Sequence, residues 1–323
     1  MSNRKYSISV PEMEFIASIR GKSILDFKPR IFNKTYRIRM SEQEYKRLEQ
    51  FRQNKQHITD LQASNEKVPR ILIFDIETAP MKAYVWGKWK QDIASSQFIS
   101  DWYVLSWSAK WLNNNNIMSD VLSPQEALNE NDERVVKSLW HLFDQSDIII
   151  AHNAQRFDVP KMNARFIING LNPPSPYRII DTLLVARKNF AFTSNKLDDL
   201  AEYFNIDHKK ETSFALWDKC VNGDQDALNY MEEYNVKDVD ILEKVYLRLR
   251  PWIKNHPNLS LYFENEEETC PYCGSTNLAD TGTFTYTNVS KFSNVRCLDC
   301  HAVSRRRTSE YPKDKRKNLI TSV

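Results

Sequence analysis

The sequence lacks any hydrophobic run that approaches about 18 residues, and its first fifteen residues, MSNRKYSISVPEMEF, contain no apolar segment typical of a signal peptide. We therefore expect neither a membrane span nor secretion, and we expect the protein to act in the cytoplasm. Cysteine is also scarce, with five residues in 323. Four of them form a metal-type pattern, and Cys220 stands apart, as a small buried residue would.

Neither charge sign dominates the whole chain, which has a formal net charge of +3, but the two signs are separated along it. Residues 1–70 carry 15 basic and 8 acidic residues, residues 71–268 carry 21 and 30, and residues 269–323 carry 9 and 4. Basic ends around an acidic middle can bind a polyanion at the ends and cations at the centre. Solvated basic termini would give the same pattern, so charge alone leaves both interpretations open.

The composition supports folded domains, because 41% of the residues are hydrophobic and 12% are aromatic. The basic N-terminal segment predicts a small, mainly helical module, in which Ser41 and Glu44 form a capping-box pattern at the start of a helix. The module is either a nucleic-acid-binding unit of helix-turn-helix type or a supporting unit. We expect the following division: 1–68, the basic N-terminal module; 69–255, an α/β domain; 266–305, a zinc ribbon; and 306–323, a basic tail.

Apolar segments in the middle domain come first as successive strands and then alternate with helical patterns. This order predicts an α/β fold with a mixed sheet flanked by helices. The expected strands or apolar segments are 71–76, 102–112, 117–122, 147–151 and 177–185, and the expected helices are 131–145, 159–169, 196–204 and 224–249.

Carboxylates stand at the ends of several of these elements. Asp75 and Glu77 point the same way from the end of a strand, because side chains alternate with period two. Asp158 follows a second strand and opens a helix, and Asp238 shares a helix face with Tyr234 four residues earlier. Each feature alone is more often a solvated or structural position. Together they predict several buried carboxylates that need a hard cation as partner, which Mg²⁺ or Mn²⁺ would satisfy.

In these motifs the chain resembles the DEDD superfamily of 3′→5′ exonucleases, in its tyrosine-bearing subclass. Phe74 through Thr78 resembles the first motif, Asn153 through Asp158 the second, and Tyr234 through Asp238 the third. The resemblance covers roughly residues 70–250 and is closest to the proofreading domains of family B DNA polymerases and their stand-alone relatives. It implies a free-standing nuclease of a bacterial or phage-infected cell. It also implies a ribonuclease-H-like fold and a site for two Mg²⁺ or Mn²⁺ ions.

The same resemblance implies a role for each acidic residue. Asp75 would bridge both ions, Glu77 and Asp238 would complete the site of the ion that binds the attacking water, and Asp158 would hold the second ion. Tyr234 would orient the attacking water through its hydroxyl group.

Four further residues are candidate substrate contacts. Thr78 and Asn153 would lie near the terminal nucleotide, as the resemblance implies. Lys161 and Arg165 share a helix face with Asp158 and could receive phosphates, although a solvated basic face would look the same. His152 and Asp181 are expected to be structural. Some of five tryptophans could stack on bases, although we expect at least three to pack in the core: Trp86, Trp89, Trp102, Trp107 and Trp111.

Two Cys-x2-Cys pairs, separated by 23 residues rich in Thr, Phe, Tyr and Val, predict a zinc ribbon with one structural Zn²⁺. Two disulfides are the alternative, which is disfavoured without a secretion signal. The expected ligands are Cys270, Cys273, Cys297 and Cys300.

The sequence thus predicts a metal-dependent 3′→5′ exonuclease that acts on single-stranded or frayed 3′ ends, of DNA in the first place. Its expected partners are single-stranded nucleic acid and a separate polymerase or replication protein, with no membrane. The alternatives are a catalytically silent nucleic-acid-binding or adaptor protein on the same fold, an RNA-directed exonuclease, and an endonuclease of ribonuclease H or resolvase type.

Overall fold

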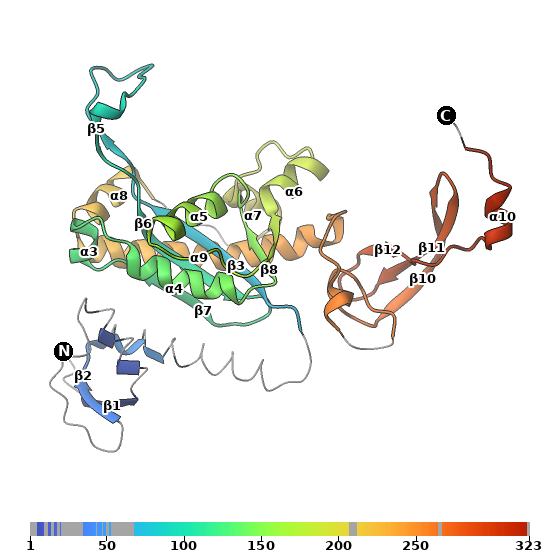
Figure 1. The fold of residues 1–323 in the computed structure, drawn as a ribbon, viewed down its shortest axis with the longest axis horizontal. Helices are drawn as coiled ribbons and strands as arrows, with labels where there is room; N and C mark the ends of the chain where they lie inside the picture. The colour runs from blue at the N-terminus through green and yellow to red at the C-terminus, as the bar shows by residue number, and fades with distance from the viewer. Residues whose placement is uncertain are drawn as a thin grey trace.

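The computed structural model of the chain has a central α/β body between a small N-terminal region and a C-terminal region of three strands (Figure 1). Within the described residues no helix is both long and apolar enough to cross a membrane. The structure describes residues 68–206, 212–263 and 267–321, together with 5–9, 12–13, 16–17, 20, 35–42, 44–46, 48–49 and 52 of the N-terminal region.

The body is built on a five-stranded mixed sheet with the order β7-β6-β3-β8-β9, so that β3 lies at its centre. β6 pairs antiparallel with both β3 and β7, whereas β8 runs parallel to β3 and β9 runs parallel to β8. The predicted mixed sheet is confirmed. Its strands are β3 (Ile71–Thr78), β6 (Val104–Trp111), β7 (Ile117–Val121), β8 (Ile148–Ala151) and β9 (Arg178–Asp181).

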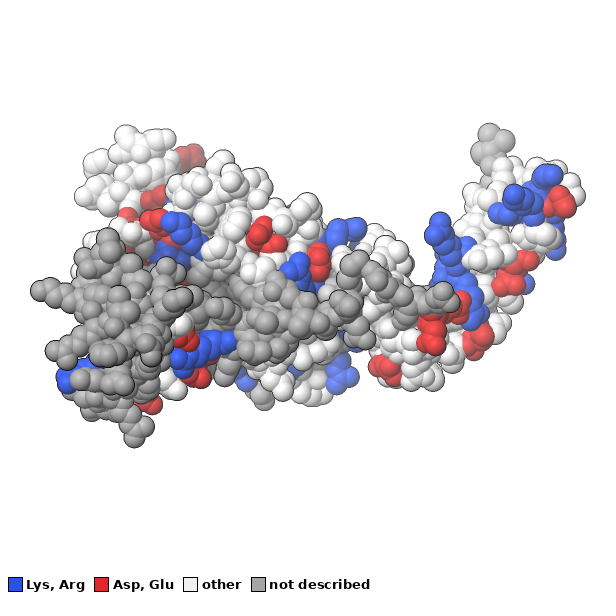
Figure 2. Space-filling model, turned by 60° about the horizontal axis from the view of Figure 1, so that its bottom comes forward, with Lys and Arg blue, Asp and Glu red and all other residues white. Residues whose placement is uncertain are grey.

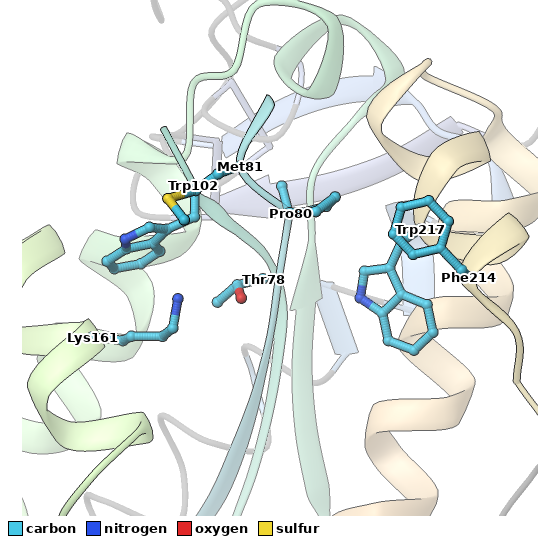
Figure 3. Close-up of a pocket in the computed structure, with 8 residues that line it drawn as sticks. Thr78, Pro80, Met81, Trp102, Lys161, Phe214 and Trp217 are labelled. Atoms are coloured by element: carbon cyan, nitrogen blue, oxygen red, sulfur yellow. The ribbon is translucent and has the colours of Figure 1, made fainter. Parts of the chain in front are cut away.

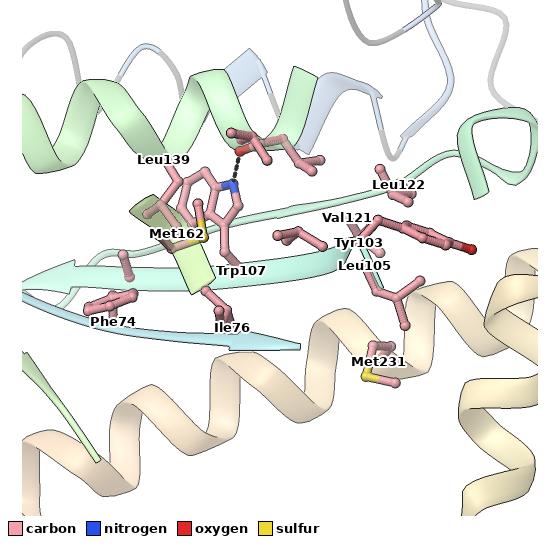
Figure 4. Packing of buried hydrophobic residues seen from close by; sticks show 14 of the residues in the cluster. Phe74, Ile76, Tyr103, Leu105, Trp107, Val121, Leu122, Leu139, Met162 and Met231 are labelled. Atoms are coloured by element: carbon pink, nitrogen blue, oxygen red, sulfur yellow. Dashed lines mark hydrogen bonds between the residues drawn. The ribbon is translucent and has the colours of Figure 1, made fainter. Parts of the chain in front are cut away.

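Helices cover the two faces of this sheet (Figure 1). The longest, α9, has 25 residues and packs along β3, β6 and β7, while α4 packs against β6 and β7 from the other side (Figure 4). The helices of the body are α3 (Pro124–Leu128), α4 (Glu133–Asp144), α5 (Asp158–Ile168), α6 (Thr182–Asn189), α7 (Leu197–Tyr203), α8 (Phe214–Val221) and α9 (Gln225–Leu249), followed by η3 (Arg250–Trp252) and η4 (Leu259–Tyr262).

The alternation along β3 divides the core into two layers. Leu72, Phe74 and Ile76 belong to the cluster that includes α4 and α5, and Phe74 meets the ring of Phe143 edge to face at 4.9 Å (Figure 4). Ile71 and Ile73 belong to the cluster that includes α6, α7 and the C-terminal half of α9. Since side chains alternate with period two, the two carboxylates further along β3 lie on the α9 side. Burial of the odd-numbered isoleucines therefore fixes the direction of the acidic pair.

The N-terminal region contains strands that the sequence did not predict. Its described residues include an antiparallel pair, β1 (Lys5–Ser9) and β2 (Thr35–Arg39), beside helical residues, and the helix-turn-helix interpretation stays a prediction. The capping box at the predicted helix is present, because Glu44 N–H donates to Ser41 Oγ at 3.2 Å and Ser41 N–H donates to Glu44 Oε2 at 2.7 Å. The described part of this region is thus mixed α/β.

The expected strand 177–185 is also corrected, because only its first part is extended. β9 ends at Asp181, whose side chain accepts hydrogen bonds from the backbone N–H groups of Leu183 and Leu184 and so begins α6. An apolar run alone does not distinguish a strand from a buried helix, and the capping aspartate decides the matter here.

The C-terminal region is a three-stranded antiparallel sheet of β10 (Leu278–Thr287), β11 (Ser290–Cys297) and β12 (Val303–Arg305), followed by α10 (Lys313–Lys317). It contacts the end of α9 through Tyr246, whose hydroxyl meets His256 Nε2 at 2.8 Å, and the ring of His256 lies 5.1 Å from that of Tyr272. Lysine and arginine side chains gather over this region at the right of Figure 2.

Candidate active site

A cavity of about 760 Å³ opens at the end of β3, between that strand, the turn before α5, the α6–α7 connection and α9. We call it the acidic cavity. Its walls contain all five residues predicted to be catalytic, and also Asn153. The acidic and aromatic members of its lining are Asp75, Glu77, His152, Phe157, Asp158, Asp198, Tyr234 and Asp238.

Three of the carboxylates form a compact group. Asp75 and Glu77 come from β3 and Asp238 from α9, and each offers an oxygen such that these oxygens all lie within 4.8 Å of one another. Two oxygens on one Mg²⁺ lie at most about 4.2 Å apart, twice the ion–oxygen distance of about 2.1 Å. Small side-chain rotations would bring the three into that range. The donor set and its spacing fit a hard divalent cation.

Asn235, which the sequence analysis missed, supports this group from α9. Its side-chain Nδ2 donates to Asp75 Oδ2 at 2.6 Å, and the residue is completely buried. The signal was available, because Asn235 lies directly after Tyr234 on a face predicted to point inward. A neutral donor beside three carboxylates orients Asp75 without adding a further negative charge.

Asp158 lines the same cavity but lies outside the group of three among the described residues. It is the first residue of α5 and is 2% exposed. Burial raises its pKa to about 7, and the nearby Asp181 carboxylate adds to the shift, whereas backbone hydrogen bonds and Lys161 oppose it. Its Oδ2 is buried without a hydrogen-bond partner. An orphaned buried carboxylate oxygen that faces this cavity is suited to a second cation.

Asp181 positions the turn that carries the second motif. Its carboxylate accepts hydrogen bonds from the backbone N–H groups of Asn153 at 3.1 Å and Gln155 at 3.0 Å, in addition to capping α6. Asn153 has a positive φ of 75°, a conformation in which asparagine is enriched. His152 is held by Thr182 Oγ1 at 2.9 Å and by the carbonyl oxygen of Asn195 at 3.0 Å. The structural roles predicted for His152 and Asp181 agree with these contacts.

Tyr234 stands one helical turn before Asp238 on α9 and is 9% exposed. Its ring meets that of Trp217 on α8 at 6.5 Å with an interplanar angle of 73°. α8 was not predicted, and its Trp217 packs edge to face against the tyrosine ring. Cys220 on the same helix is completely buried, as expected.

A second cavity of about 500 Å³, which we call the aromatic cavity, adjoins Thr78 at the end of β3 (Figure 3). Lys161 lines this cavity and not the acidic one, with its Nζ 3.6 Å from the centre of the Trp102 ring. Burial lowers the pKa of Lys161, and the nearby carboxylates of Asp101 and Asp158 oppose the shift. Thr78 and Lys161 are therefore adjacent to the acidic cavity and are not part of its lining.

Arg165 lines neither cavity. Its Nη2 lies 2.5 Å from Oδ1 of Asp132, a buried carboxylate that also accepts a hydrogen bond from the backbone N–H of Val104. This ion pair argues against the predicted phosphate contact, because the guanidinium group is engaged in the protein interior. We correct that assignment and treat Arg165 as structural.

Two cations that the sequence analysis missed do line the acidic cavity. Arg187 belongs to the last turn of α6, and Lys196 precedes α7; both line the cavity and are exposed. Neither forms an ion pair within the described part of the chain. No local pattern distinguished them from solvated lysines and arginines, since only the fold of the α6–α7 connection brings them to the site.

The five tryptophans do not follow the expectation that at least three of them pack in the core. Trp107 and Trp111 are buried, and the indole N–H of Trp107 donates to the carbonyl oxygen of Val135 at 2.8 Å (Figure 4). Trp102 is partly buried at the aromatic cavity, whereas Trp86 and Trp89 are almost fully exposed.

The four predicted cysteine ligands come together at the base of the C-terminal sheet. The Sγ atoms of Cys270 and Cys300 are 3.5 Å apart, and those of Cys273 and Cys297 are 3.6 Å apart. These distances are too long for disulfides and close to the ~3.8 Å between sulfurs that a tetrahedral Zn²⁺ with Zn–S of about 2.3 Å requires. Gly274 has a φ of 76°, and a Cβ there would lie 2.3 Å from the Phe263 ring. The cluster fits a zinc ribbon.

A comparison with family models agrees with the strand order and the acidic cavity. Residues 72–250, more than half of the chain, match the family model of the RNase H superfamily. The chain belongs to this superfamily, and the predicted ribonuclease-H-like fold is confirmed.

A curated relative agrees with the family. The DNA polymerase III PolC-type of Ureaplasma parvum serovar 3 (strain ATCC 700970) is 26% identical to this chain over 163 residues, which is 47% of this chain and 11% of the relative. The chain thus spans about a tenth of the relative's length. The two matches confirm the resemblance to the DEDD exonucleases and support a hydrolase of nuclease type.

Proposed function

We propose that the protein is a 3′→5′ exonuclease that hydrolyses phosphodiester bonds at single-stranded or frayed 3′ ends of DNA. The observation that carries this proposal is the convergence of Asp75, Glu77, Asp158 and Asp238 with Tyr234 on one cavity. These residues come from three separate parts of the chain, and the DEDD resemblance names the same set.

The proposed roles follow from the placement of the side chains. Asp75, Glu77 and Asp238 would hold one divalent ion, and Asp158 would hold the second together with Asp75. Mg²⁺ or Mn²⁺ bound there would supply activation of water and stabilisation of the leaving oxygen. Tyr234 would orient the attacking water through its hydroxyl group, because α9 and Trp217 fix its ring at the cavity wall.

The substrate would be held around these carboxylates. Asn153 lines the acidic cavity and Thr78 adjoins it, so both are proposed to contact the terminal nucleotide. Arg187 and Lys196 are proposed to contact the phosphates of the incoming strand, since exposed cations in the cavity lining offset the negative charge of the site. The ribbon and the basic tail would add phosphate contacts, and a separate polymerase or replication protein would be the protein partner.

The decisive experiment uses a 5′-labelled single-stranded DNA oligonucleotide with Mg²⁺ or Mn²⁺. Wild type should produce a ladder that shortens from the 3′ end, and Asp75→Ala should abolish it. Asp218→Ala, on the exposed surface of α8, is the matched control. Equal activity in wild type and Asp75→Ala would refute the site. An internal cut would favour an endonuclease, whereas binding without any cleavage would favour the silent adaptor. The same oligonucleotide as RNA decides between the two substrates.

A further inference from the structure

Residues 81–101, which we call the arm, project from the body between β3 and β6 (Figure 1). They carry three strongly exposed aromatic side chains. Trp86 is 97% exposed, Trp89 is 84% exposed and Tyr84 is 74% exposed. Single exposed apolar residues are ordinary, but three large aromatic side chains on one short projection are not. Such a group indicates an interaction surface.

The arm is a built structure and not a loose loop. Its base is the antiparallel pair β4 (Lys82–Ala83) and β5 (Phe98–Ser100). Beyond the pair, the backbone N–H of Tyr84 donates to the carbonyl oxygen of Gln97, and the Gln97 side chain donates back to the carbonyl oxygen of Tyr84, each at 2.9 Å. Polar groups therefore shape the arm while its aromatic side chains remain free for a partner.

The root of the arm is continuous with the candidate active site. Thr78 ends β3 directly after Glu77, and Pro80 and Met81 continue from it along the wall of the aromatic cavity (Figure 3). Trp102, where the chain returns to the body, lines the same cavity and contacts Lys161, whose Nζ lies 3.6 Å from the centre of the tryptophan ring. A strand whose end lies at the carboxylates thus has a path over aromatic side chains toward the arm.

The chemistry of the arm selects single-stranded nucleic acid as its partner. Lys88 and Lys90 lie between and beside the two tryptophans, and both are exposed without an ion-pair partner within the described residues. Alternating aromatic and cationic side chains provide stacking platforms for bases and charges for the phosphates between them. A purely apolar tip would instead suit a protein surface.

We propose that the arm binds unpaired bases of the strand whose 3′ end occupies the acidic cavity, with Trp86 and Trp89 stacking on them. This inference rests on the proposed exonuclease function and adds a second contact upstream of the cleaved bond. Trp86 lies eight positions after Thr78, so the tip is at most about 29 Å from the end of β3 along an extended chain. A stacked strand rises about 3.4 Å per nucleotide, so the arm contacts bases up to about eight nucleotides from the end.

The test is a binding titration of the full-length protein with fluorescein-labelled dT20 and dT4 in EDTA, where binding is read without hydrolysis. The double variant Trp86→Ala/Trp89→Ala should bind dT20 at least about tenfold more weakly, because loss of each stacked base weakens binding roughly fivefold or more. Its loss of affinity for dT4 should be smaller than for dT20, because four stacked nucleotides cover only about 14 Å and so about half of the greatest distance to the tip. Trp252→Ala, at a 60% exposed tryptophan of η3, is the matched control and should bind like wild type.

Two further variants separate stacking from general hydrophobic contact. Trp86→Phe/Trp89→Phe should retain most of the dT20 affinity, whereas Trp86→Leu/Trp89→Leu should lose it. Unchanged dT20 binding by the alanine double variant would overturn the proposal, and equal binding by the leucine and phenylalanine variants would overturn stacking. A separate cleavage assay with Mg²⁺ tests the proposed exonuclease function. That function fails if wild type degrades neither dT20 nor dT4.

Discussion

The side chain of Asn235 on α9 donates a hydrogen bond to Oδ2 of Asp75 on β3, with 2.6 Å between the two atoms. Asp75 is one of the three clustered carboxylates, and Asn235 stands between Tyr234 and Asp238 in the helix that closes the cavity. The bond therefore links the orientation of Asp75 to α9, the helix that supplies Asp238. Groups that orient a ligand in this way affect metal affinity without touching the metal.

We expect Asn235→Leu to raise the Mg²⁺ concentration for half-maximal nuclease activity about 10- to 100-fold, because Asp75 loses its fixed orientation. Activity measured against Mg²⁺ concentration tests this, with Asn229→Leu as the control on the same helix. If Asn235→Leu shifts the midpoint no more than the control does, Asn235 has no role in orienting Asp75. A lower maximal rate at an unchanged midpoint would have the same meaning.

Substitution of Arg165 is expected to change the stability of the protein and not its binding of substrate. Arg165→Met leaves the carboxylate of Asp132 buried without its cation, and loss of one partner from a buried pair costs about 3–5 kcal/mol of unfolding free energy. The KM for DNA should stay within about twofold. Urea unfolding and steady-state kinetics measure the two effects, and Asp132→Asn/Arg165→Met should recover part of the stability. A stable Arg165→Met protein with a raised KM would restore the phosphate contact predicted from sequence.

The acidic residues could be placed from sequence because short-range geometry decides them. Period two aligns Asp75 with Glu77 and with the buried isoleucines before them, and a four-residue step aligns Tyr234 with Asp238. The four cysteines were predicted for the same reason, since the spacing within each pair is local. Family resemblance then supplied the roles, which local geometry cannot give.

Long-range contacts account for what the sequence did not reveal. Arg165 looked like a phosphate ligand because its partner, Asp132, lies 33 residues earlier in the chain. β1 and β2 pair across a similar separation, so a region with local helix signals also contains a sheet. Arg187 and Lys196 reach the cavity only through the fold of the α6–α7 connection. None of these placements has a periodic signature.

The buried Asp158 makes the metal-free protein sensitive to pH. Its pKa is raised from about 3.8 to about 7, so the native state keeps a proton that the unfolded chain releases. Its contribution to stability is therefore full below pH 4 and is lost as the pH rises toward 7. We expect urea unfolding in EDTA to show this fall for wild type relative to Asp158→Asn, whose amide does not titrate. Saturating Mg²⁺ should weaken the fall, because a bound cation favours the carboxylate. Parallel curves in EDTA would contradict the raised pKa.

The cysteine cluster predicts about one equivalent of zinc per chain. Cys273→Ser removes one of four ligands and should lower the zinc content measured by atomic emission. Cys220→Ser should leave the zinc content unchanged, because Cys220 lies in α8 and is not part of the cluster. Zinc loss should also destabilise the ribbon, since metal binding and folding are coupled in such small units. A protein that contains disulfides and no zinc would refute the assignment.

His256 predicts that the junction between α9 and the ribbon weakens in acid. Burial lowers the pKa of His256 to about 4, helped by the nearby Arg250, while the carbonyl oxygen of Pro257 opposes the shift by accepting from Nδ1. The native state therefore excludes a proton that the unfolded chain binds below pH 6.5. Stability is complete above that pH and declines toward pH 4, by at most about 1.4 kcal/mol per pH unit.

The measurement is urea unfolding of the zinc-loaded wild type and of His256→Asn between pH 7.5 and 4.5. The difference between their unfolding free energies removes the contribution of the other titrating groups. Asparagine stays neutral and can still meet Tyr246, which donates its hydroxyl proton to the neutral imidazole in wild type. The wild-type free energy of unfolding should fall below that of the variant as the pH decreases from 6.5. If the difference between the two proteins is constant with pH, His256 is not held neutral by this junction. His141→Asn, on the exposed face of α4, is the control and should follow wild type at every pH.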